Sequence, residues 1–390
     1  MHRAPLVVFS HLRWNFVDQR PRHVMTRMGE RREVLFVEEP VIEAGEARLE
    51  ITSVAPGVRV ARPHLPDPGP SFGLAQERTL ERLLSECLER DGIREFVAWL
   101  YTPMAIHVAR TLRPRGIVYD CIDELSAFHG APPELVERER ELLAHADVVF
   151  TGGPSLYRAK SRLHSFVRCF PSSVEVAHFA RAATAIEPDD QAALPRPRLG
   201  YCGVIDERFD AGIVRALAAA HPEWSVVMIG PVVAIDPESL PRAANLHDLG
   251  PRSYEQLPEY FSGWDVCLMP FAITDATRFL SPTQVLESMA AGKPVVSTPI
   301  PDVAEPYGDA VHLGEGPEGF VAACEQALSM PDPERTARES RARRVLQRTS
   351  WNETVRRMDE ILHFLADYGV WRDPSPRTRT AGRAAWSARA

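Results

Sequence analysis

The chain has 390 residues, which is enough for two domains of ordinary size. Apolar residues make up 45% and charged residues 25%, as in folded globular proteins. The formal net charge of −8 gives no overall basic surface, so we expect no nucleic-acid partner. No stretch approaches the ~18 apolar residues of a membrane-spanning helix, and the N-terminal apolar run is too short for a signal peptide. Six scattered cysteines without CxxC spacing predict buried thiols in a reducing compartment. We therefore expect a cytoplasmic protein.

In the first half of the chain, short apolar runs alternate with helical patterns. This alternation predicts an α/β fold built on a parallel, doubly wound sheet. The expected strands are 6–10, 33–38, 58–62, 96–101, 117–121, 147–151 and 166–170. The expected helices are 20–28, 76–90, 103–113 and 133–144. We assign residues 1–176 to this first, Rossmann-like domain.

A polar, proline-bearing segment, 177–197, reads as an interdomain linker, and a second α/β series follows it as domain 198–332. Its expected strands are 198–202, 225–229, 245–249, 265–269, 294–297 and 310–313, and its expected helices are 211–220, 254–261 and 282–291. Helical residues 333–370 come next. The tail 371–390 lacks periodicity, which predicts disorder. Two such domains on a linker predict a clamp with substrates in its cleft.

The segment from Trp264 to Val303 reads as strand, long loop, helix and strand. Ser281 is a candidate N-cap followed by a proline at the first helical position, and Gly292 ends the helix. A helix that opens at the carboxyl edge of a parallel strand directs its free N–H groups to where such folds bind phosphates. Glu287 lies deeper in this helix and could reach a ribose. Alternatively, Glu287 is a polar residue on a solvated face.

The block SPTQVLESMAAGKPVVSTPIPDV resembles the donor-binding segment of GT-B glycosyltransferases. FSHLRWNFVDQRPRHV, VYDCIDELSAF and GYCGVIDERFD also resemble a bacterial group sometimes found fused to UDP-galactopyranose mutase. The resemblance implies two Rossmann-like domains facing each other across a cleft, with acceptor bound by the first and nucleotide sugar by the second. It implies that helices 333–370 cross back to the first domain. It also implies that Glu287 grips the ribose, while the helix start at Ser281, Thr283 and Gln284 binds the diphosphate.

The same block departs from the family in two places. Relatives carry a glutamate that contacts the transferred sugar where this chain has Phe279, and close relatives often have lysine in place of Gln284. A missing cation weakens the phosphate site unless Arg278 or Lys293 compensates. We expect Arg278, in the loop before the helix, to supply this charge.

Other donor-binding candidates follow the first strand of the second domain and a later loop. The resemblance implies that Arg208 pairs with the diphosphate, and guanidinium suits phosphate because it binds bidentately. The alternative is a local pair of Arg208 with Asp206 or Asp210. Gly203 lets backbone approach a ligand. Tyr254, with Arg252, falls where relatives hold the nucleobase.

In the first domain, Arg13, Trp14 and Asn15 follow the first strand at the crevice edge, and Phe16 continues the loop. Aromatic rings there could stack on an acceptor sugar, and Arg13 and Asn15 could bind hydroxyls or a carboxylate. The equal alternative is a loop that packs its aromatic rings on its own helix.

Transfer with inversion needs a base for the acceptor hydroxyl. Asp123, in VYDCIDELSAF, is the candidate, although capping the following turn is an alternative role. His11 is the rival base because it also ends a strand at the cleft.

We therefore expect a glycosyltransferase that moves a sugar from a nucleotide-diphosphate sugar to a hydroxyl acceptor: a saccharide, a cell-envelope or lipid-linked precursor, or a natural product. UDP is the expected nucleotide, as a co-substrate, and no cofactor is expected. No metal site is expected either, because the sequence has no D-x-D pair or histidine cluster. A nucleotide-sugar epimerase and a catalytically silent nucleotide-sugar-binding protein are the alternatives. Weak peripheral contact with an anionic membrane is a further prediction.

Overall fold

The computed structural model describes residues 3–367 and divides into two compact units. The first unit contains the chain up to Pro171 together with the segment from Trp351 onward, and the second unit is Ser172–Ser350. The segment predicted as a linker, 177–197, is partly helical and belongs to the second unit. The predicted tail 371–390 lies outside the described residues.

The first unit is a nine-stranded sheet in the order β3-β5-β2-β1-β6-β7-β8-β9, with β4 antiparallel to β5 at one side and every other pair parallel. Its strands are β1 Leu6–Phe9, β2 Val34–Val37, β3 Val41–Ile42, β4 Arg48–Ala55, β5 Val58–Leu65, β6 Val97–Leu100, β7 Gly116–Cys121, β8 Val148–Thr151 and β9 Val167–Cys169. Its helices are α1 Arg20–Gly29, α2 Leu74–Arg90, η1 Pro103–Ala105, α3 Ile106–Thr111, η2 Leu125–Ala127, α4 Leu135–His145, α5 Pro154–Lys160 and α14 Trp351–Asp367.

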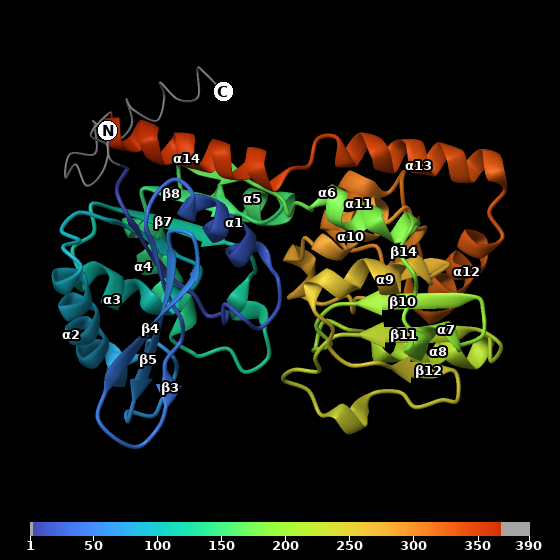
Figure 1. Ribbon diagram of the computed structural model, residues 1–390, viewed down its shortest axis with the longest axis horizontal. Helices are drawn as coiled ribbons and strands as arrows, with labels where there is room; N and C mark the ends of the chain where they lie inside the picture. The colour runs from blue at the N-terminus through green and yellow to red at the C-terminus, as the bar shows by residue number, and fades with distance from the viewer. Residues whose placement is uncertain (1–2, 368–390) are drawn as a thin grey trace. The chain divides into compact units, whose positions relative to one another are not determined.

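The central parallel strands β1, β2 and β6 are buried on both faces, which explains their uninterrupted apolar sequences. Helix α14 lies beside α1 (Figure 1) and contributes Trp351, Met358 and Leu365 to the core beneath it. This places the last described helix in the first unit.

The hairpin β4–β5 was not predicted as a pair. β4 is half exposed and alternates in burial, and it turns into β5 at Pro56-Gly57. The alternating apolar and polar residues of β4 give a weaker signal than the continuous apolar runs of the buried strands. We expected only the first part of β5.

The second unit is a six-stranded, wholly parallel sheet in the order β12-β11-β10-β13-β14-β15. Its strands are β10 Arg198–Cys202, β11 Ser225–Ile229, β12 Leu246–Asp248, β13 Val266–Met269, β14 Val295–Ser297 and β15 His312–Leu313. Its helices are α6 Val176–Phe179, η3 Ala180–Ala183, α7 Asp189–Ala192, α8 Ala211–Ala220, η4 Pro237–Ser239, η5 Tyr254–Gln256, α9 Leu257–Ser262, η6 Thr277–Phe279, α10 Thr283–Ala290, α11 Pro301–Tyr307, α12 Gly316–Leu328 and α13 Asp332–Leu346.

Two apolar clusters fill this unit, one on each face of its sheet. One contains Trp264, Val285 and Leu286, so that α10 packs through its apolar side. The other contains Leu217 of α8 and Phe320 of α12. The sheet order reverses between β10 and β13, and in parallel sheets a ligand crevice opens at that point. The predicted fold class is therefore confirmed, and it positions the loops after β10 and β13 together.

Candidate functional site

The loops after β10 and β11 approach each other as closely as backbone can. Gly203 N–H donates to the Ile229 carbonyl at 2.9 Å, and Gly230 N–H donates to the Gly250 carbonyl at 3.2 Å. A Cβ atom at Gly230, whose φ is +147°, would lie 1.8 Å from the Gly203 oxygen. Only glycine fits there. Sequence reasoning missed Gly230, although a glycine that ends a buried strand is the usual signal of such an approach.

Helix α10 opens beside these loops without a side-chain cap. We predicted Ser281 as the N-cap and Pro282 as the first helical residue, but the structure places Pro282 at the N-cap and Thr283 first. The Ser281 carbonyl accepts a hydrogen bond from Ser172 Oγ at 2.8 Å. The first N–H groups of α10 thus have no side-chain acceptor at the N-cap, and such a helix start suits an anion.

Gln284, in the first turn of α10, faces the loop after β10. A Cβ atom at Gly203 would lie only 2.7 Å from the Gln284 Nε2 atom. The structure therefore brings together Gly203, Thr283 and Gln284, three of the predicted donor-site residues. No cation stands at position 284, so the helix start supplies N–H dipoles and an amide there.

Glu287 lies one turn further along α10 and is half-buried. Its carboxylate interacts electrostatically with the Cys202 thiol at the end of β10. Burial raises the pKa of the Cys202 thiol well above its ordinary value, and the charge of Glu287 raises it further. Cys202 is the last residue of β10. The carboxylate therefore lies near this strand end, on the same helix whose start faces the loop after β10.

Arg208 is held by its neighbour Asp206. Its Nη2 atom lies 2.6 Å from Asp206 Oδ2, and its Nε atom lies 3.0 Å from Oδ1. This is the local pair that we considered as the alternative. The loop is also fixed to the loop after β13, because Ala272 N–H donates to the Arg208 carbonyl at 2.8 Å. These contacts hold Arg208 at the point where the loop after β10 meets the loop after β13.

The loop between β13 and α10 carries an exposed guanidinium. Thr277 is fully buried and anchors the loop through hydrogen bonds with Thr274 N–H at 3.0 Å and the Ala272 carbonyl. Arg278 lies over the ring of Phe279, 5.5 Å from its centroid, and pairs with no carboxylate among residues 3–367. The cation expected near the helix start is thus available from this loop.

Lys293 does not provide that cation. Its Nζ atom donates to the carbonyls of Ser262 at 3.0 Å and Trp264 at 2.9 Å, which precede β13 at the opposite edge of the sheet. Burial also lowers the pKa of Lys293. The suggestion that Lys293 compensates for Gln284 is therefore wrong, because the side chain is bound at the far end of α10.

Tyr254 and Arg252, beyond β12, are engaged within their own unit. The Tyr254 ring stacks on His178 with centroids 4.3 Å apart, and its hydroxyl donates to Glu175 Oε2 at 3.0 Å. Arg252 donates to Asp190 at 2.8 Å. These contacts fix the loop after β12.

In the first unit, a buried carboxylate fixes the loop after β1. Glu38 is fully buried, and it accepts hydrogen bonds from Trp14 N–H at 2.8 Å, Arg13 at 3.2 Å and Arg62 at 2.8 Å. The Trp14 ring packs edge-on against Phe36 with centroids 5.2 Å apart. Only 4% of Trp14 is exposed, so its predicted stacking on a sugar is wrong and the packing alternative holds for this ring.

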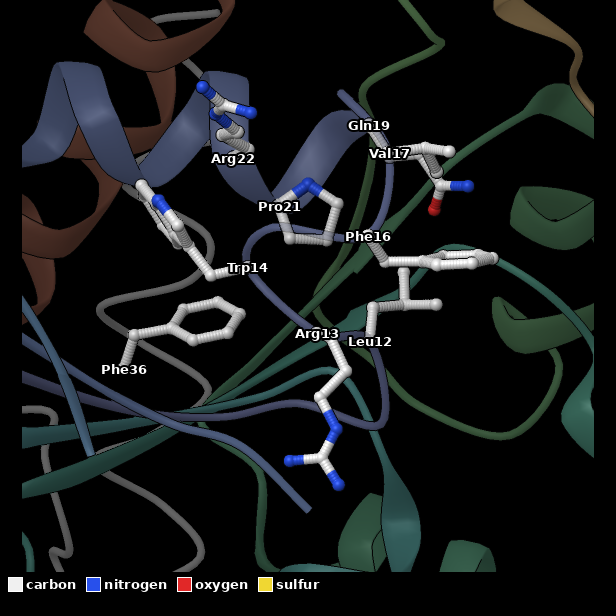
Figure 2. Close-up of a pocket in the computed structure, with 9 residues that line it drawn as sticks. All are labelled: Leu12, Arg13, Trp14, Phe16, Val17, Gln19, Pro21, Arg22 and Phe36. Carbon is white, nitrogen blue, oxygen red and sulfur yellow. The ribbon is translucent and has the colours of Figure 1, made fainter. Parts of the chain in front are cut away.

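Figure 2 shows the small pocket beside this loop, lined by Leu12, Trp14, Phe16, Pro21 and other residues of the same segment. Arg13 extends away from the Trp14 ring (Figure 2). Asn15 and Phe16 are exposed, whereas the guanidinium of Arg13 is partly exposed. Arg13 and Asn15 thus remain accessible to a ligand.

The two predicted bases differ in surroundings. Burial lowers the pKa of His11 to about 4, with a hydrogen bond to the Tyr101 backbone opposing the shift, and its Nδ1 atom has no partner in the described chain. A neutral imidazole with so low a pKa is a weak base. Asp123 is half-buried and follows β7.

The loop of Asp123 is fixed at both ends. Asp120 forms a buried ion pair with Arg20 at 2.8 Å. Glu124 pairs with Lys160 at 2.8 Å, and Lys160 also pairs with Glu139 at 2.7 Å. Asp123 therefore sits in a rigid segment, while Glu124, not Asp123, is the residue at the start of the following turn.

Within residues 3–367, no group of three or more His, Cys, Asp or Glu residues is arranged to hold a metal ion. In the same range, no helix combines the length and apolar character needed to cross a membrane.

Comparisons with known proteins agree with this geometry. Residues 196–330 match the family described as "Glycosyl transferases group 1". The chain is 27% identical over 255 residues to TuaH of Bacillus subtilis (strain 168), named as a teichuronic acid biosynthesis glycosyltransferase. The alignment covers 60% of this chain and 64% of TuaH, so the chain spans less than two thirds of that relative.

Solved structures share the fold over nearly the whole chain. The sucrose-phosphate synthase of Thermosynechococcus elongatus superposes with a TM-score of 0.71 at 16% identity, covering 94% of this chain and all of that one. An E. coli structure named as trehalose-6-phosphate with UDP-2-fluoro glucose gives 0.69 at 14% identity, covering 92% and 99%. Anabaena Alr3699/HepE, in complex with UDP and glucose, gives 0.65 at 14% identity, covering 93% and 100%.

The family match covers the part of the second unit that forms this crevice. The family match includes β10, α10 and β14, and the structural likeness extends the GT-B architecture to both units. Residues 196–330 of the second unit thus resemble the group 1 glycosyl transferases, and the chain as a whole has the GT-B fold.

Proposed function

We propose that the protein transfers a sugar from a nucleoside-diphosphate sugar, with UDP as the expected nucleotide, to a hydroxyl of a saccharide acceptor. One observation supports this most: the start of α10 has no side-chain cap and opens against Gly203, with Glu287 one turn deeper. A diphosphate fits the N–H groups, and a ribose fits the carboxylate. The name of TuaH favours a cell-envelope polysaccharide as the product.

In this proposal the donor is bound before the acceptor is activated. The helix start and the guanidinium groups of Arg208 and Arg278 stabilise the diphosphate as it gains charge on leaving. We propose that these groups suffice without a metal ion. Phe279 leaves the sugar end of the donor with an apolar contact in place of a carboxylate, so the sugar specificity differs from that of relatives with an acid there. Arg13, Asn15 and the carboxylates of the first unit are the proposed acceptor-binding groups.

Donor binding is tested by thermal shift of the full chain with UDP, GDP and dTDP and their glucose conjugates. A ligand at ~100 times its Kd adds about 2.7 kcal/mol. For a domain of this size that corresponds to a rise in Tm of roughly 5–10 °C. We expect UDP to give the largest shift, and Glu287→Ala to abolish most of it. The matched control is Glu318→Gln, an exposed glutamate on α12. If all three nucleotides leave Tm unchanged, the proposal fails.

Two alternatives remain distinguishable by product. A nucleotide-sugar epimerase on the same fold would change the sugar and leave the nucleotide attached. A silent binding protein, which Phe279 and Gln284 make worth testing, would bind the nucleotide and release nothing. Release of free UDP from UDP-sugar, measured with and without oligosaccharide acceptors, supports transfer over both.

A further inference from the structure

The second unit has a cavity at the amino edge of its sheet, at the opposite end of the strands from the crevice described above. The cavity measures about 410 Å³, within the roughly 300–1,000 Å³ that small-molecule sites occupy. Its lining residues are Arg196 and Pro197 before β10, Asp265 before β13, Ala327 and Leu328 at the end of α12, and Arg335 near the start of α13. All of them belong to the second unit.

Asp265, the acidic residue among those that line the cavity, is engaged through both of its oxygens. Its Oδ1 atom accepts from Arg196 Nη1 at 2.7 Å, and its Oδ2 atom accepts from Arg198 N–H at 2.7 Å. The Asp265 N–H donates in return to the Arg198 carbonyl at 2.8 Å. Asp265 therefore joins the starts of β10 and β13, and it fixes the guanidinium of Arg196 at the cavity wall.

Arg335 brings a second guanidinium to the cavity, and no carboxylate neutralises it. The side chain is half-buried and forms no ion pair and no side-chain hydrogen bond with any of residues 3–367. The acids beside it in the sequence, Asp332 and Glu334, do not line the cavity, and Glu334 Oε1 accepts from Arg338 at 3.2 Å. A half-buried guanidinium without a counter-ion favours the binding of an anion.

Two more cations are fixed next to Asp265. Arg198 pairs with Glu187, and Lys293 Nζ donates to the Trp264 carbonyl at 2.9 Å. Together with the two guanidinium groups of the cavity wall, they set four positive charges against the two negative charges of Glu187 and Asp265. This local excess of positive charge occurs in a chain whose formal net charge is −8. The amino edge of the sheet therefore attracts anions.

We propose that this cavity binds a small organic anion, whose phosphate or carboxylate group lies between Arg196 and Arg335 and whose apolar part packs on Pro197, Ala327 and Leu328. A guanidinium binds two oxygens of either group bidentately, and it stays charged at every pH at which the protein is folded. The cavity lies at the far end of β10 and β13 from the proposed donor site. The inference is therefore independent of the proposed function and of any contact with the first unit.

The test is isothermal titration of the full chain with phenyl phosphate and with benzoate, at constant ionic strength and with sodium chloride as the blank titrant. Each probe joins an apolar ring to one of the two anionic groups. We expect at least one probe to bind, and Arg335→Gln to weaken its Kd by ~10–100-fold, because charged hydrogen bonds are lost. Arg335→Gln should leave Tm unchanged, because the side chain has no partner in the described chain. Arg343→Gln, at an exposed arginine later on α13, is the matched control and should change Kd by less than about twofold.

Binding of either probe with this dependence on Arg335 supports the inference, and the tighter probe identifies the anionic group of the ligand as phosphate or carboxylate. Saturating UDP should leave the Kd of the probe unchanged, because UDP is expected at the carboxyl edge of the sheet. The inference is overturned if neither probe gives heat above the blank, if Arg335→Gln binds as tightly as Arg343→Gln, or if UDP displaces the probe. Failure of UDP itself to bind would instead overturn the proposed function, and the comparison of Arg335→Gln with Arg343→Gln would still decide this inference.

Discussion

Substitution of Gly230 by alanine probes the close approach that shapes the second-unit crevice. An added Cβ would lie 1.8 Å from the Gly203 oxygen, whereas real Cβ atoms essentially never approach another atom within 3.0 Å. The loop after β10 or β11 must therefore move by more than an ångström. The φ of +147° adds a backbone cost of roughly 1–3 kcal/mol for any residue other than glycine. Steric and backbone costs together should reach ~3–5 kcal/mol.

The matched control is Gly292→Ala. Gly292, just after α10, also has a positive φ, of +71°, but an added Cβ there meets nothing within 4 Å. Gly292→Ala should therefore lower the free energy of unfolding only by the backbone cost of the positive φ, about 1 kcal/mol. The free energy of unfolding from guanidinium titration measures both variants, and the difference isolates the close approach. Because Gly203 also faces Gln284, we expect Gly230→Ala to weaken UDP binding as well, by roughly tenfold, in isothermal titration. If the free energy of unfolding of Gly230→Ala is within 0.5 kcal/mol of that of Gly292→Ala and both bind UDP equally well, the close approach of Gly230 to Gly203 does not constrain this site.

Three further predictions follow from the contacts described above. Glu287→Gln should weaken UDP binding by ~10–100-fold, because a charged hydrogen bond to the ribose contributes about 1.5–3 kcal/mol; an unchanged dissociation constant would exclude the ribose role. Lys293→Met should leave the UDP dissociation constant within twofold while lowering Tm, since its partners are the carbonyls before β13; a large affinity loss would contradict that placement. Burial alone would raise the pKa of Glu38, but bonds from Arg62, Trp14 N–H and Arg13 outweigh it, and the pKa is lowered. Its stabilising contribution should therefore be complete above pH ~4.5 and be lost as pH falls through the lowered value. Glu38→Gln should flatten this acid limb in unfolding titrations from pH 6 to 3, and an unaltered limb would count against the assignment.

The sequence by itself determined the fold class and most of the strands and helices. Buried parallel strands are continuous apolar runs, helix starts are marked by Ser and Pro and helix ends by Gly, so these signals are local in the chain. The placement of α10 after β13, with Glu287 on it, followed from these signals. The boundary error at Ser281 was a single residue, because a proline can occupy either the N-cap or the first turn. The half-exposed strand β4 was missed because alternating apolar and polar residues give a weaker signal than a continuous apolar run.

Only the tertiary structure decided which charged side chains are available to a ligand. Lys293 and Arg278 both belong to the segment around α10, yet one is bound to carbonyls at the far edge of the sheet and the other is exposed. Trp14 was predicted to stack on a sugar, but it is a buried core residue. Burial, ion pairing and close backbone approach depend on which loops the sheet order brings together. The local sequence records none of these contacts, because their partners lie tens of residues away along the chain.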